Sequence, residues 1–168
     1  MSKIDRRSFL AAGIASASLS IPAARAATEP RYRSFRPGEL WLDSAGKPIQ
    51  AHGGSMFHLD GAFYWYGENK EFTTGRTDVF SWGVRCYRST DLYNWDDLGL
   101  IIQPDLHDRT SPLHPSAGLD RPHIIYHPRL KRYVCWVKMV KGAIQTRAVL
   151  TAETLTGPYT LMKQGIAP

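Results

Sequence analysis

Short apolar runs separated by turn residues, recurring in two similar halves, constrain the fold of this 168-residue chain more than any other feature. Beyond residue 28 the apolar residues show no helical period, so the pattern indicates strands. Asp60-Gly61 and Leu130-Lys131 occupy equivalent turns at an offset of 70, and Trp95 matches Tyr159 at an offset of 64. Four antiparallel strands per repeat are typical of β-propeller blades, so we expect an all-β chain with about two blades.

The apolar runs predict short strands in which nearly every residue is apolar. The expected ranges are 39–42, 56–59, 62–66, 84–88, 98–102, 123–126, 133–138, 144–150 and 160–163. Phe63-Tyr64-Trp65-Tyr66 does not alternate with polar residues, because the middle strands of a blade are packed on both faces. A propeller needs about four blades to close, so we expect an incomplete propeller and a longer protein. The remaining blades, or a partner chain, would cover the open faces.

The first 27 residues predict an export signal that precedes a propeller domain over 28–168. Arg6-Arg7-Ser8-Phe9-Leu10 is followed by a weakly apolar run and by Ala24-Arg25-Ala26, the order of a twin-arginine signal. An ordinary secretion signal with a chance arginine pair is the alternative, and either one predicts a periplasmic or secreted protein. The run is too short and too rich in small residues for a membrane anchor.

Charge and cysteine content exclude two further classes. The signal holds four basic residues and one acidic residue, so its removal would lower the formal net charge from +6 to +3. The remaining Lys and Arg are scattered, which argues against a nucleic-acid partner. Cys86 and Cys135 are too few for a disulfide scaffold and lie in apolar runs, so buried free thiols are expected, with a single bridge as the alternative.

Several motifs together resemble glycoside hydrolase family 43. The motifs are Pro48-Ile49-Gln50-Ala51-His52-Gly53-Gly54, Phe63-Tyr64-Trp65-Tyr66-Gly67-Glu68-Asn69-Lys70, Cys86-Tyr87-Arg88-Ser89-Thr90-Asp91-Leu92-Tyr93-Asn94-Trp95, Asp120-Arg121-Pro122 and Gly157-Pro158-Tyr159. The resemblance runs from about residue 37 to 168 and is nearest to the galactan β-1,3-galactosidase-like branch. It implies the N-terminal portion of a five-bladed β-propeller with its active site at one mouth, an oligo- or polysaccharide as partner, and inverting hydrolysis.

The resemblance implies sugar-binding candidates where strands reach that mouth: His52, Glu68, Asn69, Trp82, Asp120 and Arg121. Gly67 would let the backbone turn so that Glu68 meets sugar hydroxyls, whereas the alternative leaves Glu68 and Lys70 idle at a solvated rim. His52 would face the same funnel or be satisfied by backbone. Arg121 would hold Asp120 or Glu68 ionised through a bidentate pair, or brace neighbouring blades.

Asp120 stands where galactanase-like members usually carry Glu, one methylene longer. Trp82 lies in a loop and could form a subsite wall, whereas blade packing is expected for the other four tryptophans.

The resemblance implies no complete catalytic pair within these 168 residues. Inverting glycosidases need a general acid and a general base. The family's acid is a Glu from a later blade, and its base Asp would fall near His52, where this chain and its galactanase-like relatives lack it. We therefore expect an N-terminal fragment of an exported glycoside hydrolase that is inactive alone. The alternatives are a non-catalytic carbohydrate-binding module and a half-propeller that needs a partner chain.

Metal binding has little support in the sequence. His107, Asp108 and His114 share one loop, but their spacing fits no zinc pattern, so a surface loop is expected. No cofactor is expected for these two repeats, although the resemblance allows a calcium ion in the channel of the whole propeller.

Overall fold

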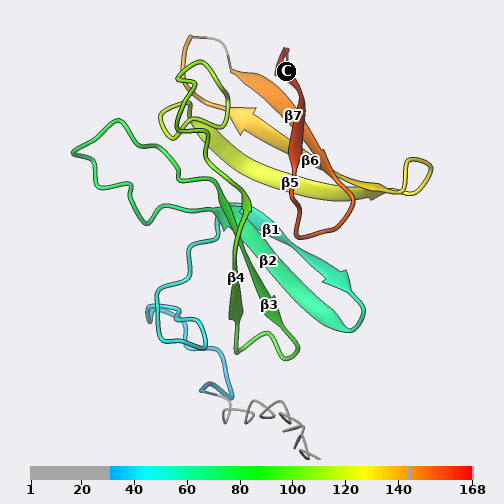
Figure 1. Cartoon of the computed structure of the whole chain (residues 1–168). Helices are drawn as coiled ribbons and strands as arrows, with labels where there is room; N and C mark the ends of the chain where they lie inside the picture. The colour runs from blue at the N-terminus through cyan, green and yellow to red at the C-terminus, as the bar shows by residue number, and fades with distance from the viewer. Residues whose placement is uncertain (1–30, 144, 168) are drawn as a thin grey trace, which may run out of the picture.

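The chain folds into two four-stranded antiparallel sheets, as seen in a computed structural model that describes residues 31–143 and 145–167 (Figure 1). The first sheet has the order β1-β2-β3-β4 and the second the order β5-β6-β7-β8. Their bounds are His52–Leu59 for β1, Ala62–Glu68 for β2, Val84–Ser89 for β3, Asp96–Ile102 for β4, Leu119–His127 for β5, Arg132–Met139 for β6, Thr146–Ala152 for β7 and Thr160–Ile166 for β8. Two sequential meanders of this kind are two β-propeller blades, which confirms the predicted fold class.

Turn chemistry fixes the register of each meander. Asp60 and Gly61 both have positive φ, so the β1–β2 hairpin closes in two residues, with Leu59 opposite Ala62. The equivalent β5–β6 turn is longer and places His127 opposite Arg132. Both first strands carry a register shift near their start, between His52 and Ser55 in β1 and between Asp120 and His123 in β5. The sequence repeat is thus a structural repeat, bulges included.

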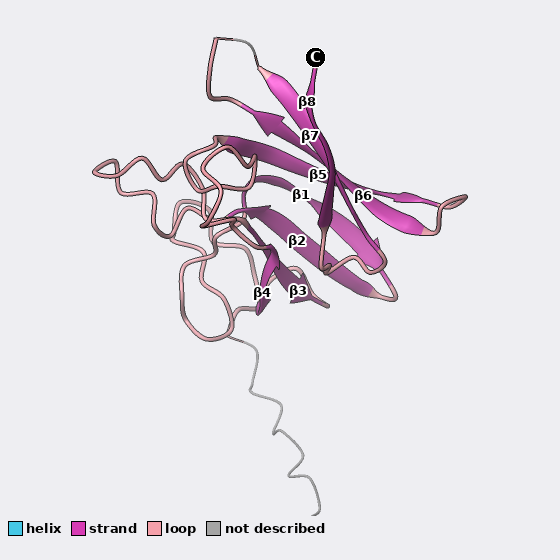
Figure 2. Ribbon diagram, turned by 45° about the horizontal axis from the view of Figure 1, so that its top comes forward, coloured by secondary structure: helices cyan, strands magenta, loops and turns pink. Residues whose placement is uncertain are grey.

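The main core lies between the two sheets, where β5 packs against β1 and β2 (Figure 2). Tyr66 and Cys86 of the first sheet meet Cys135 and Leu150 of the second, all fully buried. Phe63 and Trp65, which alternate with Tyr64 and Tyr66, pack on a second cluster around Tyr87 and Trp95. The strand at 63–66 is therefore apolar because each of its faces packs on a different cluster, as predicted.

The predicted strand at 39–42 is wrong. Within 31–50 the structure has a single isolated bridge, between Leu42 and Pro48, around a turn in which the Asp43 carboxylate accepts the amides of Ala45 and Lys47. This Asx-type turn satisfies the backbone locally, so the segment needs no sheet partner. The segment lies along the outer face of the first sheet, where Trp41 packs on Trp65 with ring centroids 4.9 Å apart.

The described residues include both cysteines but not the proposed signal. Cys86 and Cys135 are buried free thiols, as expected, and burial raises the pKa of each to about 12. The arginine pair and residues 1–30 lie outside the described part, as does Ile144 of the expected 144–150 strand. Among the residues that are described, none forms a helix that could span a bilayer.

Candidate functional site

A polar corner forms where β1 and β5 begin and β2 and β6 end. His52 lies opposite Glu68 across the β1–β2 ladder, and Asp120 lies opposite Lys138 across the β5–β6 ladder. Because β5 packs on β1 and β2, these two pairs meet at the same end of the two sheets. The predicted grouping of Glu68 with Asp120 and Arg121 is thus seen, although Glu68 ends the second strand of its sheet, not the innermost one.

Glu68 is buried at the centre of this corner, with 2% of its surface exposed. Its Oε1 accepts the backbone N–H of Arg121 at 2.9 Å, and its Oε2 lies 2.6 Å from Lys70 Nζ. Burial raises the pKa of the Glu68 carboxyl, while the Lys70 ammonium and the Arg121 amide oppose that rise and Asp120 adds to it. Glu68 is thus neither idle nor at a solvated rim, because it joins the two sheets. Its contact with a sugar stays a prediction.

Gly53 and Gly67 make room for this carboxylate and for the neighbouring strand. Gly53 has a φ of +58°, and a Cβ there would lie 2.7 Å from Glu68 Oε1. Gly67 sits inside β2, where a Cβ would lie 2.3 Å from the carbonyl carbon of Ala51. The predicted turn at Gly67 is therefore wrong, because close approach of β1, not a change of direction, requires glycine there.

Lys70 is the group that the candidate set lacked. Its ammonium contacts Glu68, donates to the Phe80 carbonyl at 2.7 Å and lies 3.6 Å from the centroid of the Phe80 ring. It thereby fastens the long β2–β3 loop to the buried carboxylate. The sequence does place Lys70 two residues after Glu68, which ends β2. This spacing alone does not show that the β2–β3 loop folds back towards the carboxylate.

Three candidates present polar groups on the accessible side of the corner. The Arg121 side chain is 73% exposed and its φ is +49°, while the Asp120 side chain is 18% exposed. Arg121 Nε lies 3.7 Å from Asp120 Oδ2, which is a single contact and not the bidentate pair considered above. One link between the blades runs through the Arg121 backbone amide.

His52 is exposed and pairs with a side chain rather than with backbone. Its Nε2 lies 3.2 Å from Gln50 Oε1, which also accepts the backbone N–H of Lys70. Partial burial of the ring, followed by the Lys70 charge, lowers the pKa of His52. The lowered pKa favours the neutral imidazole, which can both donate and accept a hydrogen bond.

Asn69 and Trp82 serve the loop more directly than the mouth. Asn69 is fully buried, and its Oδ1 accepts the Glu71 amide, whereas its contact with a sugar stays a prediction. Trp82 donates its backbone N–H to the Asn69 carbonyl and packs edge-on against Phe72 at 5.0 Å. Trp82 is half-buried, and with the exposed Phe72 it forms an aromatic pair at this end of the sheet.

The described residues offer no metal centre. No three His, Cys, Asp or Glu side chains among them gather at ligating distance. In the 103–118 loop His114 Nδ1 bonds Ser116 Oγ, and Asp108 Oδ1 accepts the Thr110 hydroxyl.

Comparison with known proteins gives a consistent set of relatives. No protein-family model and no curated protein matches the chain. A solved GH43 β-1,3-galactosidase is 37% identical over 77% of this chain and 27% of its own, with a TM-score of 0.65. An exo-β-1,3-galactanase from Phanerochaete chrysosporium is 32% identical over 77% and 29%, with a TM-score of 0.66. The enzyme from Clostridium thermocellum is 28% identical over 76% and 26%, with a TM-score of 0.63.

The chain thus spans between a quarter and a third of the length of these three structures. Within that span both the sequence and the two-blade fold agree with theirs, as the resemblance predicted. The chain belongs to glycoside hydrolase family 43, and its relatives lie in the β-1,3-galactosidase branch.

Proposed function

We propose that this chain supplies two blades of a glycoside hydrolase that removes galactose from the ends of β-1,3-linked galactan. The observation that carries the proposal is the 37% identity to a β-1,3-galactosidase over 77% of the chain. A Phanerochaete chrysosporium exo-β-1,3-galactanase solved with galactose, 32% identical, supports the same substrate class.

In this proposal the polar corner forms part of the sugar-binding mouth. His52, Asp120 and Arg121 present an imidazole, a carboxylate and a guanidinium on its accessible side. These groups can accept and donate hydrogen bonds to vicinal hydroxyls of one galactose residue. Glu68 and Lys70 act behind them, since the buried carboxylate fixes the Arg121 backbone. The general acid comes from a further blade, and hydrolysis inverts the anomeric carbon.

The experiment is to read the coding DNA through and beyond the Pro168 codon and to assay the product of the whole reading frame on β-1,3-galactan. We expect NMR of the reaction mixture to show that galactose is released with inverted anomeric configuration. Asp120→Asn is expected to lower kcat/KM by about 100-fold or more, whereas Asp120→Glu, which restores the longer carboxylate, retains activity. Release of arabinose or xylose but not galactose, or binding without hydrolysis, would contradict the proposal.

We further propose that the protein works outside the cytoplasm after twin-arginine export. The support is the Arg6-Arg7-Ser8-Phe9-Leu10 motif and the Ala24-Arg25-Ala26 site, in the part of the chain outside the described residues. Changing both arginines to lysine is expected to hold the unprocessed protein in the cytoplasm. Continued export of that variant, measured by fractionation, would contradict this route.

A further inference from the structure

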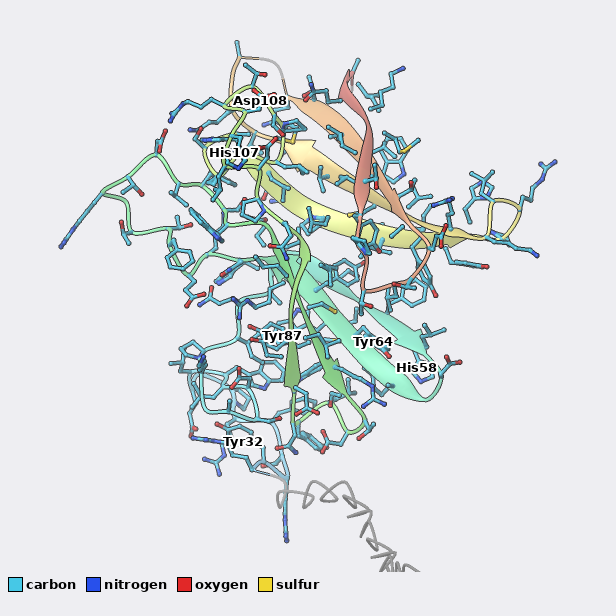
Figure 3. The ribbon with its side chains drawn as sticks, viewed as in Figure 1. Tyr32, His58, Tyr64, Tyr87, His107 and Asp108 are labelled. Atoms are coloured by element: carbon cyan, nitrogen blue, oxygen red, sulfur yellow. The ribbon has the colours of Figure 1, made fainter. Side chains whose placement is uncertain are left out.

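A second concave site lies at the opposite end of the first sheet from Glu68. The cavity holds about 230 Å³ and lies between segment 32–41 and Tyr93. Tyr93 belongs to the β3–β4 connection, whereas Glu68 ends β2, which runs antiparallel to β3 with Glu68 opposite Val84. Figure 3 shows Tyr32 at one end of the molecule, and His107 and Asp108 at the other. The cavity is therefore separate from the proposed mouth.

The walls of this cavity are fixed by hydrogen bonds from Asn94. Its Oδ1 accepts the Tyr32 backbone N–H at 2.9 Å, and its Nδ2 donates to the Tyr32 carbonyl at 2.8 Å. The Asp91 carboxylate in turn accepts the backbone amides of Tyr93 and Asn94, both at 2.8 Å. Both walls are thus held before any ligand arrives, which lowers the ordering cost of binding.

Aromatic rings line the cavity and remain partly open to solvent. Phe35 is 53% exposed, with its centroid 4.7 Å from Tyr93 and 6.0 Å from Trp41. Trp41 is 37% exposed although its other side packs on Trp65. Exposed, preorganised aromatic rings are suited to the apolar C–H faces of sugar rings.

Two charged side chains of opposite sign stand at the same cavity. Arg36 Nη1 lies 3.5 Å from Glu39 Oε2, and both side chains are more than half exposed. Side by side they offer N–H donors and carboxylate acceptors with no net charge, which matches adjacent hydroxyl groups better than a phosphate or a carboxylate ligand. The volume is below the range of roughly 300 Å³ and above that is typical of drug-sized ligands, so a single ring is the fitting size.

We propose that this cavity is an accessory saccharide-binding site that takes one residue of a neutral polysaccharide. The sugar ring stacks on the face of one of the two nearly perpendicular rings, Phe35 or Trp41, and contacts the edge of the other, while Arg36 and Glu39 hold two of its hydroxyls. That the polysaccharide is galactan rests on the proposed function. That the ligand is a neutral sugar ring rests on the cavity itself. Such a site tethers the chain to its polymer at a distance from the mouth.

The test uses the full chain with its five tryptophans labelled with fluorine and followed by ¹⁹F NMR. The Trp41 signal is assigned with Trp41→Phe, and the protein is titrated with β-1,3-galactobiose. We expect a saturable shift of the Trp41 signal, and about tenfold weaker binding in Phe35→Ala and in Glu39→Gln. Phe72→Ala, an exposed aromatic at the other end of the sheet, is the matched control and leaves the Trp41 titration unchanged.

Trp82, which lies against Asn69 in the β2–β3 loop, reports separately on the Glu68 end of the first sheet. A Trp41 signal that stays fixed while Trp82 shifts overturns the accessory site and leaves the proposed function intact. A Trp41 shift with Trp82 unmoved supports the accessory site independently of the mouth. An equal response to mannitol, which has no ring face, or a shift that follows protein concentration without sugar, also overturns the proposal.

Discussion

The two sheets share one topology but differ in what covers their outer faces. On the first sheet segment 31–50 covers Trp65 and Trp95, so Trp95 is fully buried. On the second sheet Trp136 and Ile125 point away from the core and are 40% and 44% exposed. The middle strands of both sheets are nearly continuously apolar. This pattern indicates that both faces of a blade are suited to packing. Whether a face is buried depends on the segment that covers it.

The largest effect is expected at the covered face. Trp95→Ala removes a fully buried ring that packs edge-on against Trp65 at 5.4 Å, so the free energy of unfolding should fall by about 3–5 kcal/mol. Denaturant unfolding of the full chain measures this loss. A loss below about 1 kcal/mol would mean that the aromatic cluster does not hold segment 31–50 on the sheet.

An intermediate effect is expected at the joint between the sheets. Glu68→Gln removes the ion pair with Lys70 and should destabilise the chain by about 2 kcal/mol at neutral pH. Because burial raises the pKa of Glu68, the folded state retains a proton that the unfolded state has lost only in the pH window between the ordinary value of 4.5 and the folded value. The wild-type contribution of Glu68 is therefore greatest below its ordinary pKa of 4.5 and declines as pH rises through the folded value.

The Glu68→Gln variant should lack this decline of stability with rising pH. The difference between the wild-type and variant profiles of unfolding free energy against pH therefore gives the contribution of the Glu68 carboxyl. Glu71→Gln is the control, since the Glu71 side chain is 48% exposed and its contact with Arg85 is 3.3 Å long. Identical pH profiles for wild type and Glu68→Gln would argue against a buried carboxyl at this joint.

The smallest effect on stability is expected at the bare face. In the 168-residue chain by itself, Trp136→Lys should change the free energy of unfolding by less than about 1 kcal/mol. A loss as large as that of Trp95→Ala in this chain would reveal that a second copy covers this face.

Local signals predicted the fold well. The Asp60-Gly61 turn, the repeat and the apolar runs correctly gave two meanders, because hairpins and blade strands are specified by neighbouring residues. The sequence also grouped Glu68 with Asp120 and Arg121. It missed the role of Lys70 and the burial of Asn69, since both depend on how the 70–83 loop folds back. It misassigned 39–42 because an apolar run can cover a sheet without joining it.

The position of Glu68 also limits how this protein can change over generations. A substitution there alters the docking of two sheets and the shape of the mouth in one step, so a new substrate preference at that residue would come with a folding defect. The side chains of His52 and Arg121 are exposed beside the joint, so substitutions there disturb the docking of the two sheets less. In directed evolution of specificity, successful mutations are therefore expected at the exposed residues beside the joint, in libraries that leave Glu68 unchanged.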